Sequence, residues 1–257
     1  MILETDLLYA NDQYQRHLDV MVPDGSGPFP VVVCIHGGGW QQGVKEDMYP
    51  YAEWLLEIGV ASVLPNYRLT GVAPHPAQQD DVRAAMHWMA DYAEDYRFDL
   101  SRVGLTGVSA GGHLSALIGC RESARDDTPY RIRCMYPVCP PTDMVRFLDD
   151  NPGIRPVIEA LVGGRIEDRL DVIADVSPIT HVHPNAPACV CVHGSVDNLV
   201  PNSQSTVFVE ALKRAGVDAE AILVPGADHA AFQPGKEPLE PLGGLAPFLD
   251  FFRKHLL

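Results

Sequence analysis

Three side chains in this sequence could together attack a carbonyl group. Ser109 lies in the run GVSAGG, where small residues flank it on both sides. Asp197 lies in HGSVDN and His229 in PGADH, so a carboxylate and an imidazole follow the serine along the chain. In such a set the imidazole takes the proton of the serine hydroxyl, and the carboxylate orients the imidazole. These residue types therefore predict a triad with Ser109 as nucleophile, His229 as base and Asp197 as acid.

A fourth stretch, HGGGW at residues 36–40, could supply hydrogen-bond donors. The tetrahedral intermediate of acyl transfer carries an oxyanion, which N–H groups fixed in advance stabilise. Because glycines let the backbone come close, we assign the N–H groups of Gly38, Gly39 and Ala110 to this oxyanion hole. Trp40 has two interpretations: it lines the substrate pocket, or it anchors the glycine loop.

All four stretches follow predicted strands. Continuous apolar runs predict strands that are buried on both faces. The runs that precede the glycine loop, Ser109, Asp197 and His229 cover residues 31–35, 103–108, 188–192 and 219–224, respectively. The G-x-S-x-G pattern around Ser109 permits a tight turn from strand to helix. Because α/β proteins bind ligands at the carboxyl ends of parallel strands, the four stretches are predicted to form one site.

The rest of the chain alternates strands and helices. The remaining predicted elements are strands at 5–9, 15–22, 60–64 and 132–138 and helices at 48–58, 77–96, 203–215 and 245–255, besides a helix directly after Ser109. This order predicts an α/β fold with a mostly parallel, doubly wound sheet and helices on both faces. The first two strands alternate polar and apolar residues, which predicts a half-exposed antiparallel pair joined by a turn at 10–13.

We expect a single domain over residues 1–257, since this length and 46% apolar residues suffice for one large core. Residues 140–187 interrupt the alternation. They contain short helical patches near 144–148, 156–161 and 167–174, separated by Pro and Gly. We expect this segment to form a small lid insertion.

Charge and composition exclude several classes of partner. The formal net charge of −15 disfavours nucleic acids and anionic membranes, which would repel the chain. We find no signal peptide and no apolar run long enough for a membrane span, so we expect a cytoplasmic protein. The six cysteines lie mostly in strand-like runs and lack zinc-site spacing. We therefore expect buried free thiols, no metal and no cofactor.

Six motifs resemble, in order, those of the α/β-hydrolase esterases. They are HGGGW at 36–40, NYRL at 66–69, HPAQQDDVRAAMHWM at 75–89, GVSAGGHLSAL at 107–117, HGSVDNLVP at 193–201 and VPGADHAAF at 224–232. The chain is most similar to bacterial HGGGW-type carboxylesterases related to feruloyl esterases and hormone-sensitive-lipase-like enzymes. The resemblance covers nearly the whole chain. It implies the α/β-hydrolase fold, carboxylesterase activity and the roles assigned above to the triad and the glycine loop.

The resemblance also bears on the substrate and the scaffold. Hormone-sensitive-lipase-like enzymes carry a longer N-terminal cap, whereas only 35 residues precede His36 here. A small lid at 140–187 implies a shallow cleft for small-molecule esters with short acyl or bulky aryl groups, including hydroxycinnamoyl esters. Arg68 and Asp81 match family positions that form a structural ion pair. The oligomeric state is open, and a homodimer is one option because many relatives form dimers.

Two other functions fit the same motifs. Kynurenine formamidases share the glycine loop followed by tryptophan, so an N-formyl amidase of the N-formylkynurenine type is the alternative to an esterase. A non-catalytic binder with the hydrolase fold is a further alternative, although all the expected catalytic residues are present.

Asp143 is an alternative to Asp197 as the triad acid, because it follows the strand predicted at 132–138. We favour Asp197, which matches the family motif and follows the penultimate strand, and we expect Asp143 to cap a short helix. Asp228 is expected to be a solvated turn residue.

The other histidines that invite a chemical role have structural interpretations. We expect His36 to hold the glycine loop and His113 to pack the helix after Ser109. His181 and His183 have H-x-H spacing, but they lack further partners for a metal site.

Overall fold

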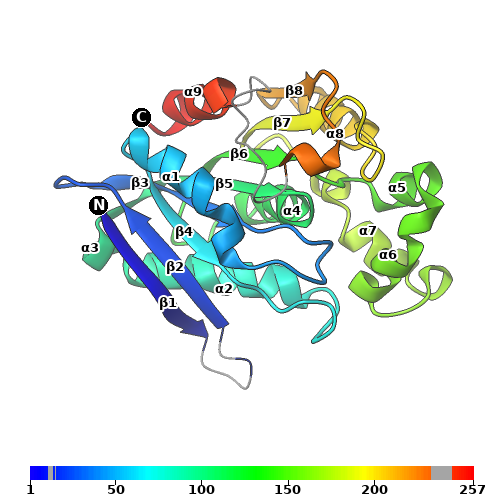
Figure 1. Cartoon of the computed structure of the whole chain (residues 1–257), viewed down its shortest axis with the longest axis horizontal. Helices are drawn as coiled ribbons and strands as arrows, with labels where there is room; N and C mark the ends of the chain where they lie inside the picture. The colour runs from blue at the N-terminus through cyan, green and yellow to red at the C-terminus, as the bar shows by residue number, and fades with distance from the viewer. Residues whose placement is uncertain (11–13, 15, 233–244) are drawn as a thin grey trace.

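Eight strands form one sheet in the computed structural model, which describes all residues of the chain except 11–13, 15 and 233–244 (Figure 1). The strand order is β1-β2-β4-β3-β5-β6-β7-β8. The strands are β1 (Ile2–Ala10), β2 (Arg16–Val22), β3 (Phe29–Ile35), β4 (Ala61–Pro65), β5 (Phe98–Val108), β6 (Ile132–Val138), β7 (Ala188–Gly194) and β8 (Ala219–Val224). Strand β2 pairs antiparallel with β1 and β4, and the other pairs are parallel. The predicted mostly parallel sheet is thus confirmed.

Helices cover both faces of this sheet, as predicted. Alternate residues of each central strand point to opposite faces, so Val31 and Val33 belong to one half of the core and Val32 and Cys34 to the other. The first half packs against α2 (Ala77–Asp91), α3 (Ala93–Tyr96), α4 (Ala110–Ser123) and α8 (Ser203–Arg214). The second packs against α1 (Tyr49–Glu57) and α9 (Leu245–Leu256).

Helix α9 lies close to the strand that leads to Ser109. A Cβ atom at Gly104 of β5 would lie only 2.9 Å from Cε1 of Phe252 on α9. Phe252 and Phe248 are fully buried between the helix and the sheet. The absence of a side chain at Gly104 therefore lets α9 approach β5.

The predicted helix at 77–96 is two helices. Tyr92 leaves helical geometry, with φ −102° and ψ 16°, between α2 and α3. The break redirects the chain so that Tyr96 stacks on Phe98, with ring centroids 5.4 Å apart, as β5 begins.

The antiparallel pair β1–β2 is present, but the prediction that it is half-exposed is wrong for β2. Asp19 and Met21 are buried. The Asp19 carboxylate accepts a hydrogen bond from Tyr49 Oη at 2.6 Å and lies 3.1 Å from Nζ of the buried Lys45. This short polar cluster covers the face of β2 that alternation assigns to solvent. Most of the predicted turn at 10–13 lies outside the described residues.

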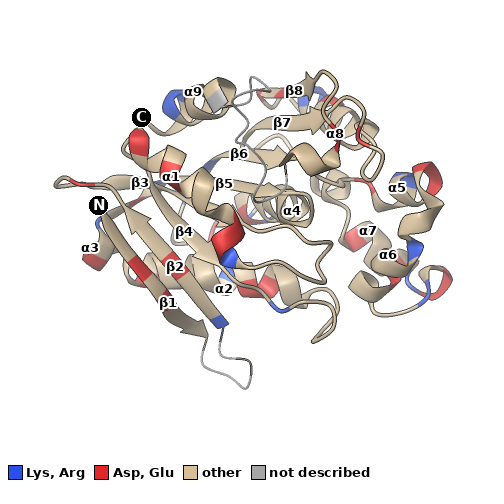
Figure 2. Cartoon of the chain, viewed as in Figure 1, with Lys and Arg blue, Asp and Glu red and all other residues tan. Residues whose placement is uncertain are grey.

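Residues 140–187 fold into short helices beyond the carboxyl end of β6, namely α5 (Met144–Asp150), α6 (Arg155–Val162) and α7 (Leu170–Asp175) (Figure 1). Their surface carries both signs of charge (Figure 2), as in the pairs of Arg155 with Glu159 and Glu167 at 3.1 and 2.9 Å. His183 Nε2 lies 2.8 Å from the carbonyl oxygen of Cys120 on α4. The segment is thereby tied to the helix that begins at the nucleophile.

Two further properties follow from the part of the chain that the structure describes. All six cysteines are unpaired and buried, which confirms the prediction of free thiols. None of the helices described combines the length and the apolar character needed to cross a bilayer.

Candidate active site

Ser109 occupies a strained turn between β5 and α4. Its φ of 55° and ψ of −115° are rare for a residue with a side chain. The turn is crowded, because a Cβ at Gly111 would lie 1.9 Å from the carbonyl oxygen of Ile35, and one at Gly107 would lie 2.5 Å from Gly111. The small residues around Ser109 are therefore needed where β3, β5 and α4 cross.

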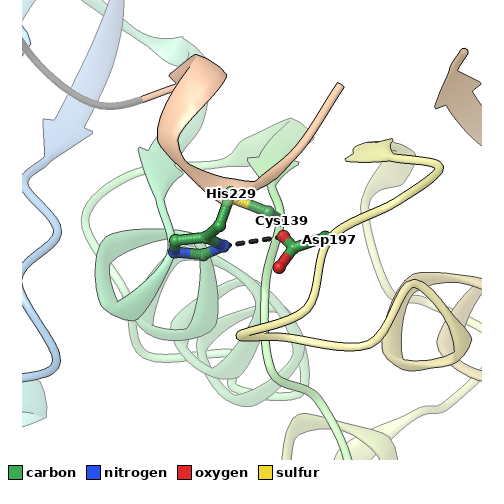
Figure 3. Close-up of side chains that lie close together, drawn as sticks. All are labelled: Cys139, Asp197 and His229. Carbon is green, nitrogen blue, oxygen red and sulfur yellow. Dashed lines mark hydrogen bonds and ion pairs between the residues drawn. The ribbon is translucent and has the colours of Figure 1, made fainter. Parts of the chain in front are cut away.

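The structure brings the three predicted triad residues together from three strand ends. His229, which follows the turn after β8, places Nε2 3.1 Å from Ser109 Oγ. Its Nδ1 lies 2.7 Å from Oδ2 of Asp197, in the loop after β7 (Figure 3). All three residues are between 7% and 8% exposed. In this geometry Nδ1–H donates to Asp197, which leaves Nε2 free to accept the serine proton.

Asp197 is held by more than His229. Its Oδ1 accepts hydrogen bonds from the N–H groups of Leu199 and Val200 at 3.0 and 2.9 Å. His193 Nε2 lies 2.8 Å from the carbonyl oxygen of Val200 and 3.3 Å from Oδ2, and His193 Nδ1 lies 2.7 Å from Ser205 Oγ on α8. Burial alone would raise the pKa of Asp197, but the hydrogen bonds from His193 and His229 hold that pKa well below its usual range. The carboxylate therefore stays ionised.

The glycine loop offers donors beside Ser109. Gly38 and Gly39 have φ values of +105° and +60°, a region that favours glycine. Among the residues described, no acceptor is bonded to the N–H of Gly38, Gly39 or Ala110. Ala110 is the first residue of α4, where an N–H lacks a partner within the helix. The three assigned groups are thus free to bind an oxyanion.

Two aromatic contacts hold this loop. Trp40 is 2% exposed and donates its indole N–H to Nδ1 of His113 at 3.2 Å. This burial and this hydrogen bond support the interpretation that Trp40 anchors the glycine loop. His36 is buried, with its ring stacked on Tyr67 at 4.1 Å and Nδ1 2.8 Å from the carbonyl oxygen of Gly37. His36 therefore holds the loop, as predicted.

The alternative carboxylates have other partners. Asp143 caps α5, since its Oδ1 accepts the N–H of Arg146 at 3.1 Å, which confirms the predicted cap. Asp228 is exposed and bonds the N–H of Ala231. Asp81 is buried and pairs with Arg68 at 2.7 Å, as expected.

A cavity of about 230 Å³ runs along the glycine loop. It is lined by Gly37, Gly38, Gln42, Gly43, Asp47, Met48, Val108 and Phe232. At Gly39, Val157 Cγ1 of α6 lies 3.7 Å from the position that a Cβ would take. The insertion therefore reaches the glycine loop.

Sequence reasoning gave no role to His193 and counted Cys139 only as a buried thiol. Cys139 follows β6 directly, has φ 39° and is fully buried. Its Sγ, an Asp197 carboxylate oxygen and a His229 ring nitrogen all lie within 4.8 Å of one another. Ligand sites in α/β proteins lie at the carboxyl ends of parallel strands, and this rule applies to Cys139 as it does to the triad residues.

The sheet order and a Ser-His-Asp set carried on β5, β8 and β7 define an α/β-hydrolase with a serine nucleophile. Comparison with known proteins agrees. The BD-FAE family profile matches residues 18–212, and the chain belongs to this family.

Relatives and solved structures extend the comparison. The chain is 30% identical to the probable carboxylic ester hydrolase LipM of Mycobacterium tuberculosis, over 81% of this chain and 51% of LipM. It thus spans about half the length of that curated relative. It is similar to a bifunctional GH43-CE protein of Bacteroides eggerthii, with 33% identity, a TM-score of 0.86 and coverage of 98% of this chain and 38% of the other. A truncated carbohydrate esterase from gut microbiota gives 26% identity, a TM-score of 0.84 and coverage of 99% and 96%.

Proposed function

We propose that this chain is a serine carboxylesterase that hydrolyses small soluble carboxylic esters through an acyl-enzyme. The observation that carries the proposal is the unbroken pair of hydrogen bonds from Ser109 to His229 and from His229 to Asp197, at 3.1 and 2.7 Å. The ester hydrolases among its relatives support an ester substrate over a formamide.

The proposed reaction gives each group of the site a role, first in acylation of Ser109 and then in deacylation. Ser109 Oγ attacks the carbonyl carbon while its proton moves to His229 Nε2. The oxyanion accepts hydrogen bonds from the N–H groups of Gly38, Gly39 and Ala110. Collapse of this intermediate expels the alcohol, which takes the proton from His229. Water then attacks the acyl-enzyme by the same route, and Asp197 stays ionised throughout.

The surroundings of the glycine loop support small substrates. Val157 of α6 faces Gly39, and we propose that residues 140–187 act as a small lid over the acyl group. The cavity of about 230 Å³ along the glycine loop has room for a compact alcohol or aryl group. Its polar residues Asp47 and Gln42 and the likeness to a carbohydrate esterase favour a sugar as one candidate alcohol.

A panel of p-nitrophenyl acetate, butyrate and feruloyl esters, acetylated sugars and N-formylkynurenine tests this function. Hydrolysis of esters by the wild type and loss of turnover in Ser109→Ala, with an unchanged melting temperature, are expected. Turnover that persists in Ser109→Ala would refute the mechanism. Failure of a fluorophosphonate probe to label Ser109 would instead support a non-catalytic binder.

The remaining expectations stay predictions. They are a single domain over residues 1–257, a cytoplasmic location, a homodimer as one oligomeric option, and a small ester rather than nucleic acid or membrane as partner.

A further inference from the structure

The thiol of Cys139 lies against the triad. Cys139 begins the loop after β6. In the sheet, β6 lies between β5, which leads to Ser109, and β7, which leads to Asp197. Its sulfur, a carboxylate oxygen of Asp197 and a ring nitrogen of His229 approach one another within 4.8 Å (Figure 3). A serine, histidine and aspartate suffice for the proposed reaction, so the thiol has no part in it.

We propose that Cys139, Asp197 and His229 form an inhibitory site for a thiophilic divalent cation such as Zn²⁺ or Cd²⁺. Thiolate, imidazole and carboxylate are the protein ligands of zinc, at about 2.3 Å for sulfur and about 2.0–2.2 Å for nitrogen and oxygen. These lengths place the ligand atoms of a tetrahedral ion about 3–4 Å apart. The observed separations, from 2.7 Å between His229 and Asp197 to at most 4.8 Å, require only small side-chain rotations. Three protein ligands with one open position are a common zinc arrangement.

Binding there would switch off the base, an effect that rests on the proposed function. A cation held by Nδ1 takes the place of the proton that His229 donates to Asp197. That proton moves to Nε2, so His229 can no longer accept the proton of Ser109. The thiol of Cys139 loses its proton to solvent and binds as thiolate, so that one proton is released for each cation bound.

The surroundings of Cys139 determine which cations bind and how fast they bind. Burial raises the pKa of the Cys139 thiol well above its usual range, and the charge of Asp197 adds to this rise. The free thiol is therefore protonated at neutral pH, and a soft cation must displace its proton. Since Asp197 and His229 are only 7% and 8% exposed, we expect binding to be slow. Mg²⁺, which prefers oxygen ligands, should not compete.

The experiment compares the wild type with Cys139→Ala and Cys139→Ser, using CdCl₂, ZnCl₂ and MgCl₂. We expect Cd²⁺ and Zn²⁺ to inhibit the wild type and EDTA to restore activity. The concentration for half-inhibition should rise at least tenfold in both variants. Cys134→Ala is the matched control, because Cys134 is an equally buried thiol near the start of β6, the strand that ends just before Cys139. The sensitivity of this variant should equal that of the wild type.

Equilibrium dialysis with Cd²⁺ provides a readout that does not depend on activity. One Cd²⁺ should bind per wild-type chain with release of one proton in weakly buffered solution, and this binding should be lost in both Cys139 variants. Equal binding or inhibition in wild type and variants would overturn the proposal, as would a wild type that binds no Cd²⁺. A chain that binds Cd²⁺ through Cys139 but hydrolyses no ester would refute the proposed function alone.

Discussion

The indole N–H of Trp40 donates to Nδ1 of His113 at 3.2 Å, while His113 Nε2 lies 2.7 Å from the carbonyl oxygen of Val176. The glycine loop, α4 and the segment after α7 thus meet at one imidazole. Nδ1 can accept the hydrogen bond from the indole N–H only while this imidazole is neutral. Burial lowers the pKa of His113 to about 3, which keeps the imidazole neutral at ordinary pH.

Stability should therefore fall on acidification. An unfolded histidine titrates near ~6.5. Between that pH and about 3, the unfolded chain binds a proton at His113 that the folded chain excludes. The free energy of unfolding then decreases by about 1.4 kcal/mol for each pH unit below ~6.5. Burial also lowers the pKa of His36, to about 4, so this group adds to the slope.

Melting temperatures from pH 7.5 to 5 check this expectation, with His113→Asn as the comparison. Because asparagine does not titrate, the melting temperature of this variant should change less with pH than that of the wild type. The variant should nevertheless be less stable at pH 7.5. Parallel pH dependences of the two proteins would contradict the assignment to His113.

The two candidate acids can be separated by matched substitutions. Asp197→Asn should lower kcat by ~10⁴-fold, because the amide favours the wrong tautomer of His229. Asp143→Asn should leave both kcat and the melting temperature unchanged, since asparagine caps a helix as well as aspartate does. Steady-state kinetics on p-nitrophenyl acetate decides, and a larger loss in Asp143→Asn would show that the assigned acid is wrong.

His193 should act as a positioning residue for Asp197. Its Nε2 lies 2.8 Å from the carbonyl oxygen of Val200, in the Asp197 loop, and 3.3 Å from Oδ2 of Asp197. Losing a polar contact with a charged group costs about 1.5–3 kcal/mol. We expect His193→Gln to lower kcat roughly ten- to a hundredfold and leave KM unchanged, because His193 does not line the cleft. The exposed His87→Gln is the control. A rise in KM with unchanged kcat would assign His193 to substrate binding instead.

The crowding at the nucleophile predicts that replacing glycine by alanine lowers stability much more at this turn than at an open position. Gly111→Ala would place Cβ 1.9 Å from a backbone oxygen of β3, so the strand and helix must separate. Overpacking typically costs ~1–3 kcal/mol, and a clash with backbone belongs at the upper end of that range, which lowers the melting temperature by roughly 10 °C. Gly71→Ala has open space around it and should stay within ~2 °C of the wild type. Equal melting temperatures for both variants would show that the turn tolerates a side chain.

The sheet and the triad were predictable because each depends on local patterns. Apolar runs locate the strands, and parallel pairing then brings their carboxyl ends, with Ser109, Asp197 and His229, to one edge. The burial of Asp19 was not predictable from alternation, since it depends on Lys45 from a distant turn.

The contacts of His193 and Cys139 also escaped prediction, for a related reason. Each depends on how a loop folds back after its strand, and a periodic pattern carries no information about that path. The catalytic roles of the site residues stay predictions until they are tested in solution.

The packing of α9 beneath β5 has a consequence for synthesis on the ribosome. Ser109, Asp197 and His229 all precede α9, so a nascent chain stalled before Leu245 already contains every catalytic side chain. It lacks Phe248 and Phe252, which fill the core under Gly104. The strained turn at Ser109 then lacks part of its support, because, of the helices described, only α1 covers that face of the sheet. Esterase activity should therefore appear only after α9 has left the exit tunnel, so that turnover reports the completion of this helix.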